Sequence, residues 1–463
     1  MTRTEKDSLG NKEIPDRAYF GIQTARAVEN FPVSGERERP EFIRAYVLVK
    51  KAAALANMEL GALDRERGEA IVKASDEVLD QKLLDQFVVD VFQAGAGTSF
   101  NMNVNEVLAN RALEIMGHQK GDYSRLSPND QVNMSQSTND TFPTASHLAV
   151  LEASRILLQN LQSLAGAFRR NGEVFARLPK PGRTHLMDAL PVTLGSEFDA
   201  YAAAIERSAE RIRQRRGDLR EVALGGTATG TGANTPEGYR SKVIGILSGL
   251  AGEELQPARN AFEALQSIAP LGAFSGSLRE LSLELGRIAN DLRLLGSGPT
   301  SGLAEIELPT VQPGSSIMAG KVNPVMAECL NMVCFQIVGA DTTVMLAAQA
   351  GQLELNVMTP VVTYNILNSC ALLNNFLPAF TARCVDGIRA DADRCRALAE
   401  RNPAMATLLS PKIGYLEASK VANEARQRDL PVAELAVMKG IITKEEAEEL
   451  LDPLRAALGR RQS

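Results

Sequence analysis

The residue types best suited to chemistry are concentrated in one ten-residue loop, 314–323. Two adjacent serines, Ser315 and Ser316, are flanked by glycines, which predicts a mobile loop that can deliver a hydroxyl to a bound molecule. Asn323 precedes a proline, a pair typical of a helix N-cap and first helical position. The positive end of that helix, together with the ammonium of Lys321, predicts a site for a small carboxylate.

Three further hydroxyl-rich clusters each stand before a predicted helix. Backbone N–H groups and hydroxyls at a helix start can bind an anion, although ordinary helix capping or a structural histidine accounts for each cluster taken alone. Together with the serine loop they indicate a binding site. The clusters are 95–101, which contains Thr98; 135–140, which contains Ser137, Thr138 and Asn139; and 182–188, which contains Thr184 and His185.

The composition excludes several classes of partner. The formal net charge of −6 is spread over 463 residues without a basic block, so neither nucleic acid nor a membrane surface is expected as a partner. The glycine-rich segment 224–232 lacks the P-loop ending and the dinucleotide spacing, so no nucleotide is expected. Three histidines and no CxxC argue against a metal centre. A polar N-terminus and interrupted apolar runs predict a cytoplasmic protein.

Helical periodicity dominates the middle of the chain. Apolar residues repeat every three or four positions in 278–295 and in 198–212, and helical patterns also fit 142–170, 324–350 and 356–390. Strand signals are sparse. The sequence therefore predicts an all-α protein of three domains: an N-terminal helical domain at 1–138, a five-helix bundle at 139–391 and a small C-terminal helical domain at 392–463.

The four clusters, in this order along the chain, resemble the active-site segments of the aspartase/fumarase superfamily. The run from Gly314 to Pro324 resembles its signature loop, and the similarity extends from Tyr19 to Tyr415. Within the superfamily, Gly95-Ala-Gly-Thr-Ser and Ser137-Thr-Asn-Asp are closest to the aspartate ammonia-lyases. The resemblance implies reversible anti-elimination of ammonia from L-aspartate to give fumarate.

The resemblance also implies a role for each candidate residue. Ser315 is the base that removes the Cβ proton, and His185 lies at the amino end of the substrate. The other roles are these: Thr98, Ser137, Thr138 and Ser316 bind the β-carboxylate; Lys321 and Asn323 bind the α-carboxylate; Asn139 and Thr184 complete the amino end. Dense donors around the β-carboxylate suit the charge that develops there during proton abstraction.

Some residues depart from the superfamily pattern and leave the substrate open. Met187 replaces a usual glutamine, Ala319 a usual proline, and Lys412 a usual histidine or tyrosine. Fumarate hydration, as in class II fumarases, is the first alternative. A C–N lyase acting on an N-substituted or nitro analogue of aspartate is the second, and a non-catalytic structural homologue is the third.

Helix lengths bear on where the site is formed. A bundle helix of roughly 30 residues is about 45 Å long, so residues before the first and the fourth bundle helix lie at opposite ends unless a crossover changes a helix direction. They can meet between neighbouring subunits. The resemblance implies a homotetramer with a shared helical core and each site drawn from three chains. No cofactor is expected, and a divalent cation such as Mg²⁺ is left open as an activator.

Overall fold

The computed structural model describes residues 1–459, which divide into two compact units. The first unit contains Met1–Leu158, Glu210–Glu280 and Phe335–Asn374. The second contains Gln159–Ala209, Leu281–Cys334 and the chain from Asn375 on. Because this division passes through the long helices, it does not test the predicted boundaries of three domains, which stay a prediction.

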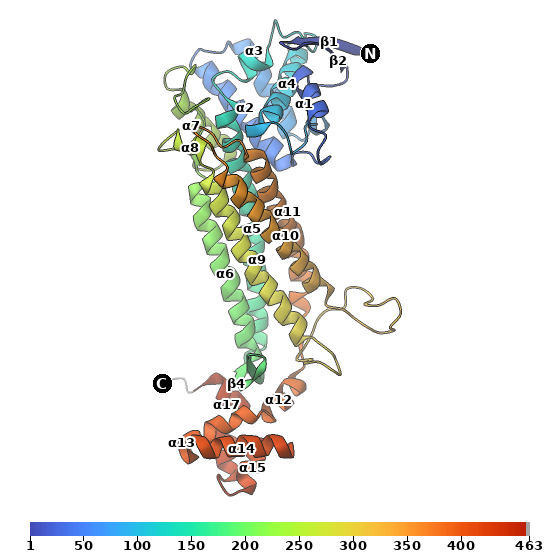
Figure 1. Ribbon diagram of the computed structural model, residues 1–463, viewed down its shortest axis with the longest axis vertical. Helices are drawn as coiled ribbons and strands as arrows, with labels where there is room; N and C mark the ends of the chain where they lie inside the picture. Colours follow the sequence, from blue (N-terminus) through green and yellow to red (C-terminus); the bar gives the residue numbers. More distant parts are fainter. Residues whose placement is uncertain (460–463) are drawn as a thin grey trace. The chain divides into compact units, whose positions relative to one another are not determined.

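Five long helices form the predicted bundle (Figure 1). Each begins near a polar or proline-containing segment and follows an apolar repeat of three and four residues. The repeat from Leu278 to Leu295 is buried along its length, with no member more than 6% exposed. The five helices are α5 (Thr138–Val174), α6 (Leu194–Asp218), α9 (Ala269–Leu295), α10 (Val325–Gln349) and α11 (Thr359–Arg383).

Side-chain contacts hold these helices together in each unit. In the first unit, the Asp341 carboxylate on α10 accepts from Ser275 and pairs with Arg279, both on α9, at 2.6 and 2.7 Å. In the second, Phe168 on α5 packs against Phe198 on α6 with ring centroids 5.9 Å apart. The prediction of an all-α bundle is therefore confirmed.

Helix α10 is unusually apolar for a helix of this bundle. It is long and apolar enough to cross a membrane by length and composition alone, with a mean hydropathy of 1.4 over the relevant window, 39% of which is buried. Its buried face nevertheless carries the ion-paired Asp341, while its other face exposes Met332, Phe335, Met345 and Leu346. One apolar face of α10 is thus left exposed by residues 1–459.

The remaining elements of the first unit surround a buried aromatic cluster. The elements are β1 (Thr2–Asp7) paired antiparallel with β2 (Gly10–Pro15), α1 (Ile22–Asn30), α2 (Pro40–Glu59), α3 (Arg65–Leu79), α4 (Thr98–Ile115), β5 (Glu221–Val222) paired parallel with β6 (Gln256–Pro257), α7 (Tyr239–Ala251) and α8 (Glu263–Gln266). Phe42 and Tyr46 on α2 lie 4.9 to 5.9 Å by ring centroids from each other, from Phe100 on α4 and from Phe142 on α5, so this cluster ties α2 and α4 to the start of α5.

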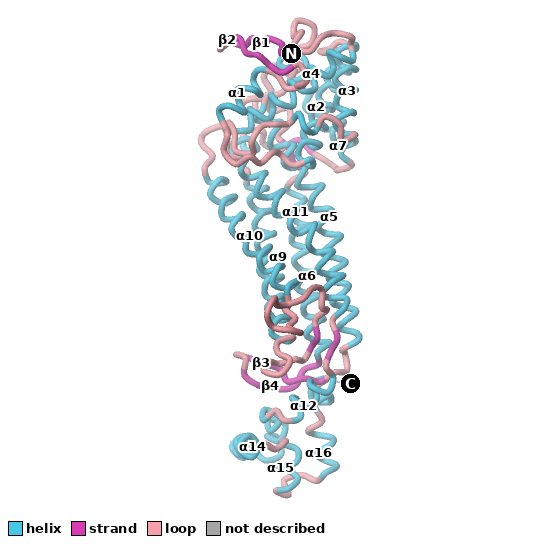
Figure 2. Tube along the Cα trace, turned by 90° about the vertical axis from the view of Figure 1, so that its right-hand side faces the viewer, coloured by secondary structure: helices cyan, strands magenta, loops and turns pink. Residues whose placement is uncertain are grey.

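The second unit adds two small sheets and a group of short helices (Figure 2). A separate apolar core, which includes Leu409, Val421 and Leu435, holds the short helices together. The elements are β3 (Pro179–Thr184) paired antiparallel with β4 (Met187–Thr193), β7 (Ile306–Glu307) paired antiparallel with β8 (Arg389–Ala390), α12 (Ala392–Glu400), α13 (Ser410–Ile413), α14 (Tyr415–Arg428), α15 (Val432–Met438), α16 (Lys444–Leu450) and α17 (Pro453–Leu458).

Candidate functional site

Thr98 is the first residue of α4, directly after a tight turn at Gly95–Gly97. Gly97 has φ +81°, and a Cβ at this position would lie 2.0 Å from the Phe142 ring. Only glycine meets both requirements. Because Phe142 lies in the first turns of α5, this close contact brings the start of α4 beside the start of α5, where the second cluster begins.

Ser137 caps α5 through a reciprocal pair of hydrogen bonds. Its Oγ accepts from the Asn139 N–H at 3.2 Å, and its own N–H donates to the Asp140 carboxylate at 2.9 Å. This is the pattern of a capping box with aspartate at the third helical position. The capping interpretation of this cluster is therefore correct. The Thr138 hydroxyl and the O–H of Ser137 can still donate to a ligand at the positive end of this long helix.

Asp140 explains the glycine-rich segment 224–232. Its second carboxylate oxygen accepts from the Gly225 and Thr227 N–H groups at 3.0 and 2.8 Å, and the Asn139 amide donates to the Ala228 carbonyl at 2.8 Å. Burial raises the pKa of Asp140 to about 6, against these hydrogen bonds, which lower it. The N–H groups of this segment thus bind a protein carboxylate, and the Ala228 carbonyl holds the Asn139 side chain.

Lys50 was not identified from the sequence, yet it connects two of the clusters. Its buried ammonium donates to the side-chain oxygens of Asn101, Asn133 and Gln136 at 2.8 to 3.0 Å. Burial lowers the pKa of Lys50 to about 7, while the charge of Asp140 opposes the shift. Lys50 lies four residues after Tyr46, on the same apolar face of a predicted helix. Because buried lysines are rare unless they are paired, this position was the signal that could have identified it.

Thr184 and His185 lie at the tip of the β3–β4 hairpin. Thr184 pairs with Met187, so the connecting turn consists of His185 and Leu186, whose φ angles are +55° and +59°. Two successive positive φ values are typical of a type I′ turn, which normally contains asparagine and glycine. A histidine and a leucine held in this conformation store backbone strain, which is concentrated at functional sites. Both tip residues are exposed.

The serine loop places Ser315 among backbone donors. The Ser315 Oγ accepts from the Ile317 and Met318 N–H groups at 3.2 and 2.9 Å. Hydrogen bonds to an oxygen favour its deprotonated form, although short polar turns use the same contacts for local structure. Ser316 is exposed, and so is Ile317, at 88%. The Ser315 hydroxyl thus has two backbone donors in a loop that is largely exposed to solvent.

Asn323 does not cap α10 as predicted. Its side-chain amide donates to the Gly314 carbonyl instead. The helix begins at Val325, and the Pro324 carbonyl accepts from the Glu328 N–H in the first turn. The Gly314 N–H donates to the Lys321 carbonyl at 2.8 Å. These contacts close the base of the loop, which competes with capping for the Asn323 side chain. The ammonium of Lys321 is exposed beside this base.

The three residues that depart from the superfamily pattern occupy different surroundings. Met187 is 70% exposed and lines a cavity of about 350 Å³ together with Asp188, Tyr415 and Arg426. Lys412 pairs with Glu446 on α16 at 2.6 Å. Ala319 is exposed within the serine loop. Met187 lies two positions after His185, and Ala319 lies two positions before Lys321.

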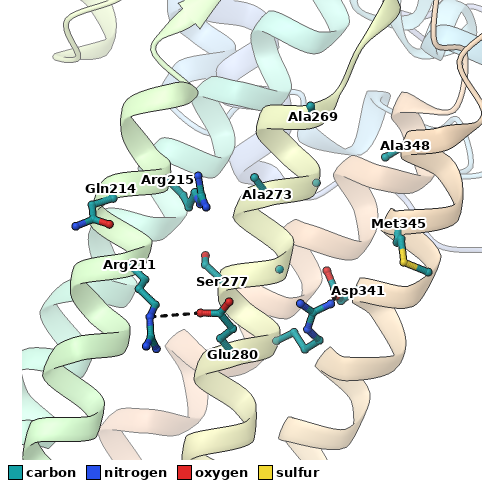
Figure 3. A pocket seen from close by; sticks show the side chains of 13 residues that line it. Arg211, Gln214, Arg215, Ala269, Ala273, Ser277, Glu280, Asp341, Met345 and Ala348 are labelled. Atoms are coloured by element: carbon teal, nitrogen blue, oxygen red, sulfur yellow. Dashed lines mark hydrogen bonds and ion pairs between the residues drawn. The ribbon is translucent and has the colours of Figure 1, made fainter.

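A second cavity of about 590 Å³ lies between α6, α9 and α10 and contains none of the ten candidate residues (Figure 3). Arg211 reaches toward Glu280 from α6, and Asp341 faces the cavity from α10. Within residues 1–459, no group of three or more histidine, cysteine, aspartate or glutamate side chains could hold a metal ion. The cavity is a polar groove on the bundle surface.

The ten candidate residues thus fall into two sets. Thr98, Ser137, Thr138 and Asn139 lie in the first unit at two adjoining helix starts, and the other six lie in the second unit on the hairpin tip and the serine loop. The first set can bind a carboxylate through hydroxyls and helix ends. The second set supplies a hydroxyl with amide donors, an imidazole and an ammonium, which are groups suited to proton removal and to binding a second carboxylate.

Comparison with protein families agrees with this chemistry. Residues 10–339 match the family described as Lyase, and residues 405–455 match the family described as Fumarase C C-terminus. An aspartate ammonia-lyase from a Bacillus species is 49% identical over 97% of this chain and 96% of its own length. An aspartate ammonia-lyase from Helicobacter pylori is 45% identical over 97% of each chain.

Two solved structures share the whole fold. A fumarate lyase:delta crystallin from Brucella melitensis, bound to cobalt, has a TM-score of 0.96 and 50% identity over 99% of this chain and 100% of that one. A class II fumarase from Schistosoma mansoni has a TM-score of 0.96 and 34% identity over the full length of both chains. With the family match extending over most of the chain and relatives of this identity along its length, the chain belongs to this lyase family of enzymes.

Proposed function

We propose that this protein is an aspartate ammonia-lyase that converts L-aspartate to fumarate and ammonia, and the reverse. The observation that carries the proposal is the Ser315 hydroxyl, which accepts two backbone N–H groups inside the loop. Relatives that are 45–49% identical along the chain are named aspartate ammonia-lyases, which supports the choice of substrate. The assignment also makes the chain a carbon–nitrogen lyase.

The reaction requires a proton to leave Cβ before ammonia leaves Cα. Ser315 takes the Cβ proton, and the electron pair moves into the neighbouring β-carboxylate, which becomes doubly charged. Thr98, Ser137, Thr138 and Ser316 donate hydrogen bonds to that carboxylate, and such donors lower the barrier because the charge develops where they point. The electrons then form the double bond as the C–N bond breaks and ammonia leaves.

The other candidate residues orient the substrate. Lys321 and Asn323 bind the α-carboxylate, while Asn139, Thr184 and His185 surround the amino group. A serine is a weak base in water, so closure of the loop over the substrate is needed to exclude solvent and to keep the amide donors on its oxygen. The exposed apolar residues of the loop, Ile317 and Met318, provide surface for that closure.

The proposal is tested by incubating the purified protein with L-aspartate, and separately with fumarate and ammonia, and following fumarate absorbance and products. Loss of fumarate that depends on ammonia and yields aspartate supports it. Absence of turnover in both directions overturns it and favours a non-catalytic homologue.

Fumarate hydration remains the main alternative because a class II fumarase shares the fold at 34% identity. A hydratase would form malate from fumarate without ammonia. Malate formation at a rate comparable to amination would change the assignment.

A substituted aspartate is the second alternative, and Met187 is the observation behind it. Its side chain lines the cavity of about 350 Å³ beside the hairpin tip, where a group attached to the amino nitrogen has room. N-substituted and nitro analogues of aspartate belong in the same assay. A higher kcat/KM for one of them than for aspartate would identify it as the substrate.

We also propose that the active site is shared between subunits of a homotetramer. Helix α5 has 37 residues and rises about 55 Å from Thr138 to Val174, and only nine residues separate its end from Thr184. Thr138 and Thr184 of one chain therefore cannot contact one four-carbon substrate. Neighbouring copies packed antiparallel remove this separation, and three chains supply each site.

The exposed face of α10 offers a surface for that packing. Phe335, Met345 and Leu346 are 70%, 57% and 53% exposed, and Met345 also lines the cavity of about 590 Å³. A second copy of the chain covering this face would bury them. Co-refolding Ser315→Ala with Asn139→Ala tests shared sites, since mixed tetramers should regain activity that neither variant has. No recovery, with mixing verified by mass, would contradict sharing.

The remaining expectations follow from the same assignment. We propose that no cofactor is required, and dialysis against EDTA should leave activity intact; loss of activity that Mg²⁺ restores would instead identify a divalent activator. We also propose a cytoplasmic location and a small dicarboxylate as the ligand. Neither nucleic acid nor a membrane is a proposed partner.

A further inference from the structure

The second unit contains a buried group of four charged side chains next to the hairpin that carries His185. Glu305 is fully buried and Lys180 is 1% exposed. Arg183 and Glu197 complete a group of two cations and two anions. The Lys180 ammonium lies 3.1 Å from the Glu305 carboxylate and 2.6 Å from the Glu197 carboxylate. We call this set the Glu305 cluster.

One contact in the cluster is a bidentate ion pair between Arg183 and Glu305. The Arg183 guanidinium donates to both oxygens of Glu305, at 2.7 and 3.1 Å. Two parallel hydrogen bonds fix the plane of the guanidinium as well as its distance, which a single ammonium contact cannot do. Arg183 precedes Thr184 directly, so the pair orients the last residues of β3 before the strained turn.

A strand irregularity adjoins the two cations that reach the same carboxylate. The β3–β4 register shifts between Pro181 and Gly182, where Leu190 of β4 has no opposite residue in β3. Lys180 and Arg183, on either side of this shift, both pair with Glu305. A Cβ on Gly182 would lie 2.5 Å from the Leu190 carbonyl oxygen, so this irregularity depends on glycine.

Both backbone polar groups of Glu305 are hydrogen-bonded. Its N–H donates to the carbonyl of Leu295, the last residue of α9, and its carbonyl accepts from the Asp391 N–H, just before α12. Strand β7 begins at the next residue. The Glu305 carboxylate therefore has a position set by two helices, and it transmits that position to the hairpin through Arg183.

We propose that Glu305 is a positioning residue for the reaction: through Arg183, it fixes the conformation of the Thr184–His185 tip that receives the amino end of the substrate. The kinetic part of this inference rests on the proposed function. Neither residue contacts substrate, so both act through the tip. Glu307, two residues later, lies in β7 and forms an exposed pair with Arg389 in β8. It supplies the matched control.

The test combines kinetics with a probe of His185. The variants are Arg183→Lys, Glu305→Gln, the double variant and the control Glu307→Gln. We expect each single variant to lower kcat/KM for aspartate by about ten- to a hundredfold, because small misplacements of contacting groups cost rates of that order. The double variant should be no slower than the slower single variant, since both changes break one contact. Glu307→Gln should behave as wild type.

The probe of His185 does not depend on the substrate. The chain has only three histidines, so ¹³C-histidine labelling gives few signals, and His185→Gln assigns the one of interest. Arg183→Lys should shift the His185 signal and leave those of His118 and His147 unchanged. Two outcomes would overturn the proposal. One is a double variant whose loss of kcat/KM is the product of the losses of the two single variants; the other is a His185 signal that does not shift in Arg183→Lys. Lack of wild-type turnover would contradict the proposed function alone, and if Glu305→Gln fails to fold, Arg183→Lys still decides the question.

Discussion

The two sets of candidate residues differ in how firmly the chain holds them. The starts of α4 and α5 rest on a buried framework: Gly97 packs on Phe142, Asp140 binds the 224–232 segment, and Lys50 joins Asn101 to Gln136. Among residues 1–459, the hydrogen bonds given for the serine loop lie at its base and within its turn, and most of its side chains are exposed. Under the proposed function, the first set is a preorganised carboxylate site, whereas the base lies on a loop with few restraints.

This difference has a chemical reason under the proposed function. The carboxylate that gains charge in the transition state benefits from fixed donors, because fixed donors do not need to reorganise as the charge develops. The base must instead admit substrate and then exclude water, which requires movement. Changes in the loop should therefore alter turnover and leave stability intact, while changes in the framework should alter stability as well.

The largest effect is expected from Ser315→Ala. Removing a general base lowers rates by about 10²–10⁴-fold, and the exposed loop can lose this hydroxyl without a change in the free energy of unfolding. The measurement is kcat for aspartate together with thermal unfolding. Ser316→Ala is the matched control and should retain more activity. Equal activity of Ser315→Ala and wild type would remove Ser315 from the base role.

A smaller kinetic effect is expected from Lys321→Met. Loss of one hydrogen bond to a charged group costs about 1.5–3 kcal/mol, or about ten- to 150-fold in kcat/KM for both aspartate and fumarate. Lys420→Met, which alters an exposed pair with Glu417, is the control and should leave kinetics unchanged. Identical kinetics of the two variants would contradict a carboxylate contact at Lys321.

Two glycines with similar backbones compare the framework with the loop directly. Gly97 and Gly320 have φ angles of +81° and +78°, but a Cβ on Gly97 meets Phe142 whereas a Cβ on Gly320 meets open space. Both alanine variants should lose roughly 1 kcal/mol from the backbone, and Gly97→Ala about 1–3 kcal/mol more from overpacking. Urea unfolding measures both. Equal losses would mean that the framework is not rigid at this point.

The last effect is confined to acidic solution and concerns the buried His147. His147 is buried, with Nδ1 3.1 Å from the Leu219 and Glu221 carbonyl oxygens, and burial lowers its pKa to about 4. The unfolded chain therefore binds more protons between pH 6.5 and 4, so stability falls on acidification through this window, by about 3 kcal/mol at most, and is insensitive to this group above it. His147→Asn should flatten this part of the pH profile, measured by urea unfolding.

Much of the fold was predictable because helical periodicity is a strong local signal. The leucine repeat from 278 to 295 marked α9 correctly, and all five long helices were found. The bounds of the bundle helices differ from the expected ranges by up to nine residues. At α10 the start differs because the Asn323 side chain binds the Gly314 carbonyl instead of capping the helix. A choice between two such partners depends on tertiary geometry, which the local sequence does not contain.

The candidate residues were chosen from type and order and stay a prediction, but the side chains that support them could not be identified in this way. Hydroxyls before a helix start are visible in a sequence, whereas the contact of Lys50 with Asn133, 83 positions away, is not. The same holds for Glu305 and Arg183, which are 122 positions apart. Such pairs form only when distant segments meet, so single-sequence patterns cannot identify them.

The length of α5 has a consequence for how the enzyme responds to dilution. If no single copy can bring Thr138 and Thr184 to one substrate, an isolated protomer has no complete site, however well it is folded. Mass action then links assembly to catalysis. Specific activity should fall as the protein is diluted below the dissociation constant of the assembly, and substrate, by bridging residues of different copies, should shift that equilibrium toward the assembled form.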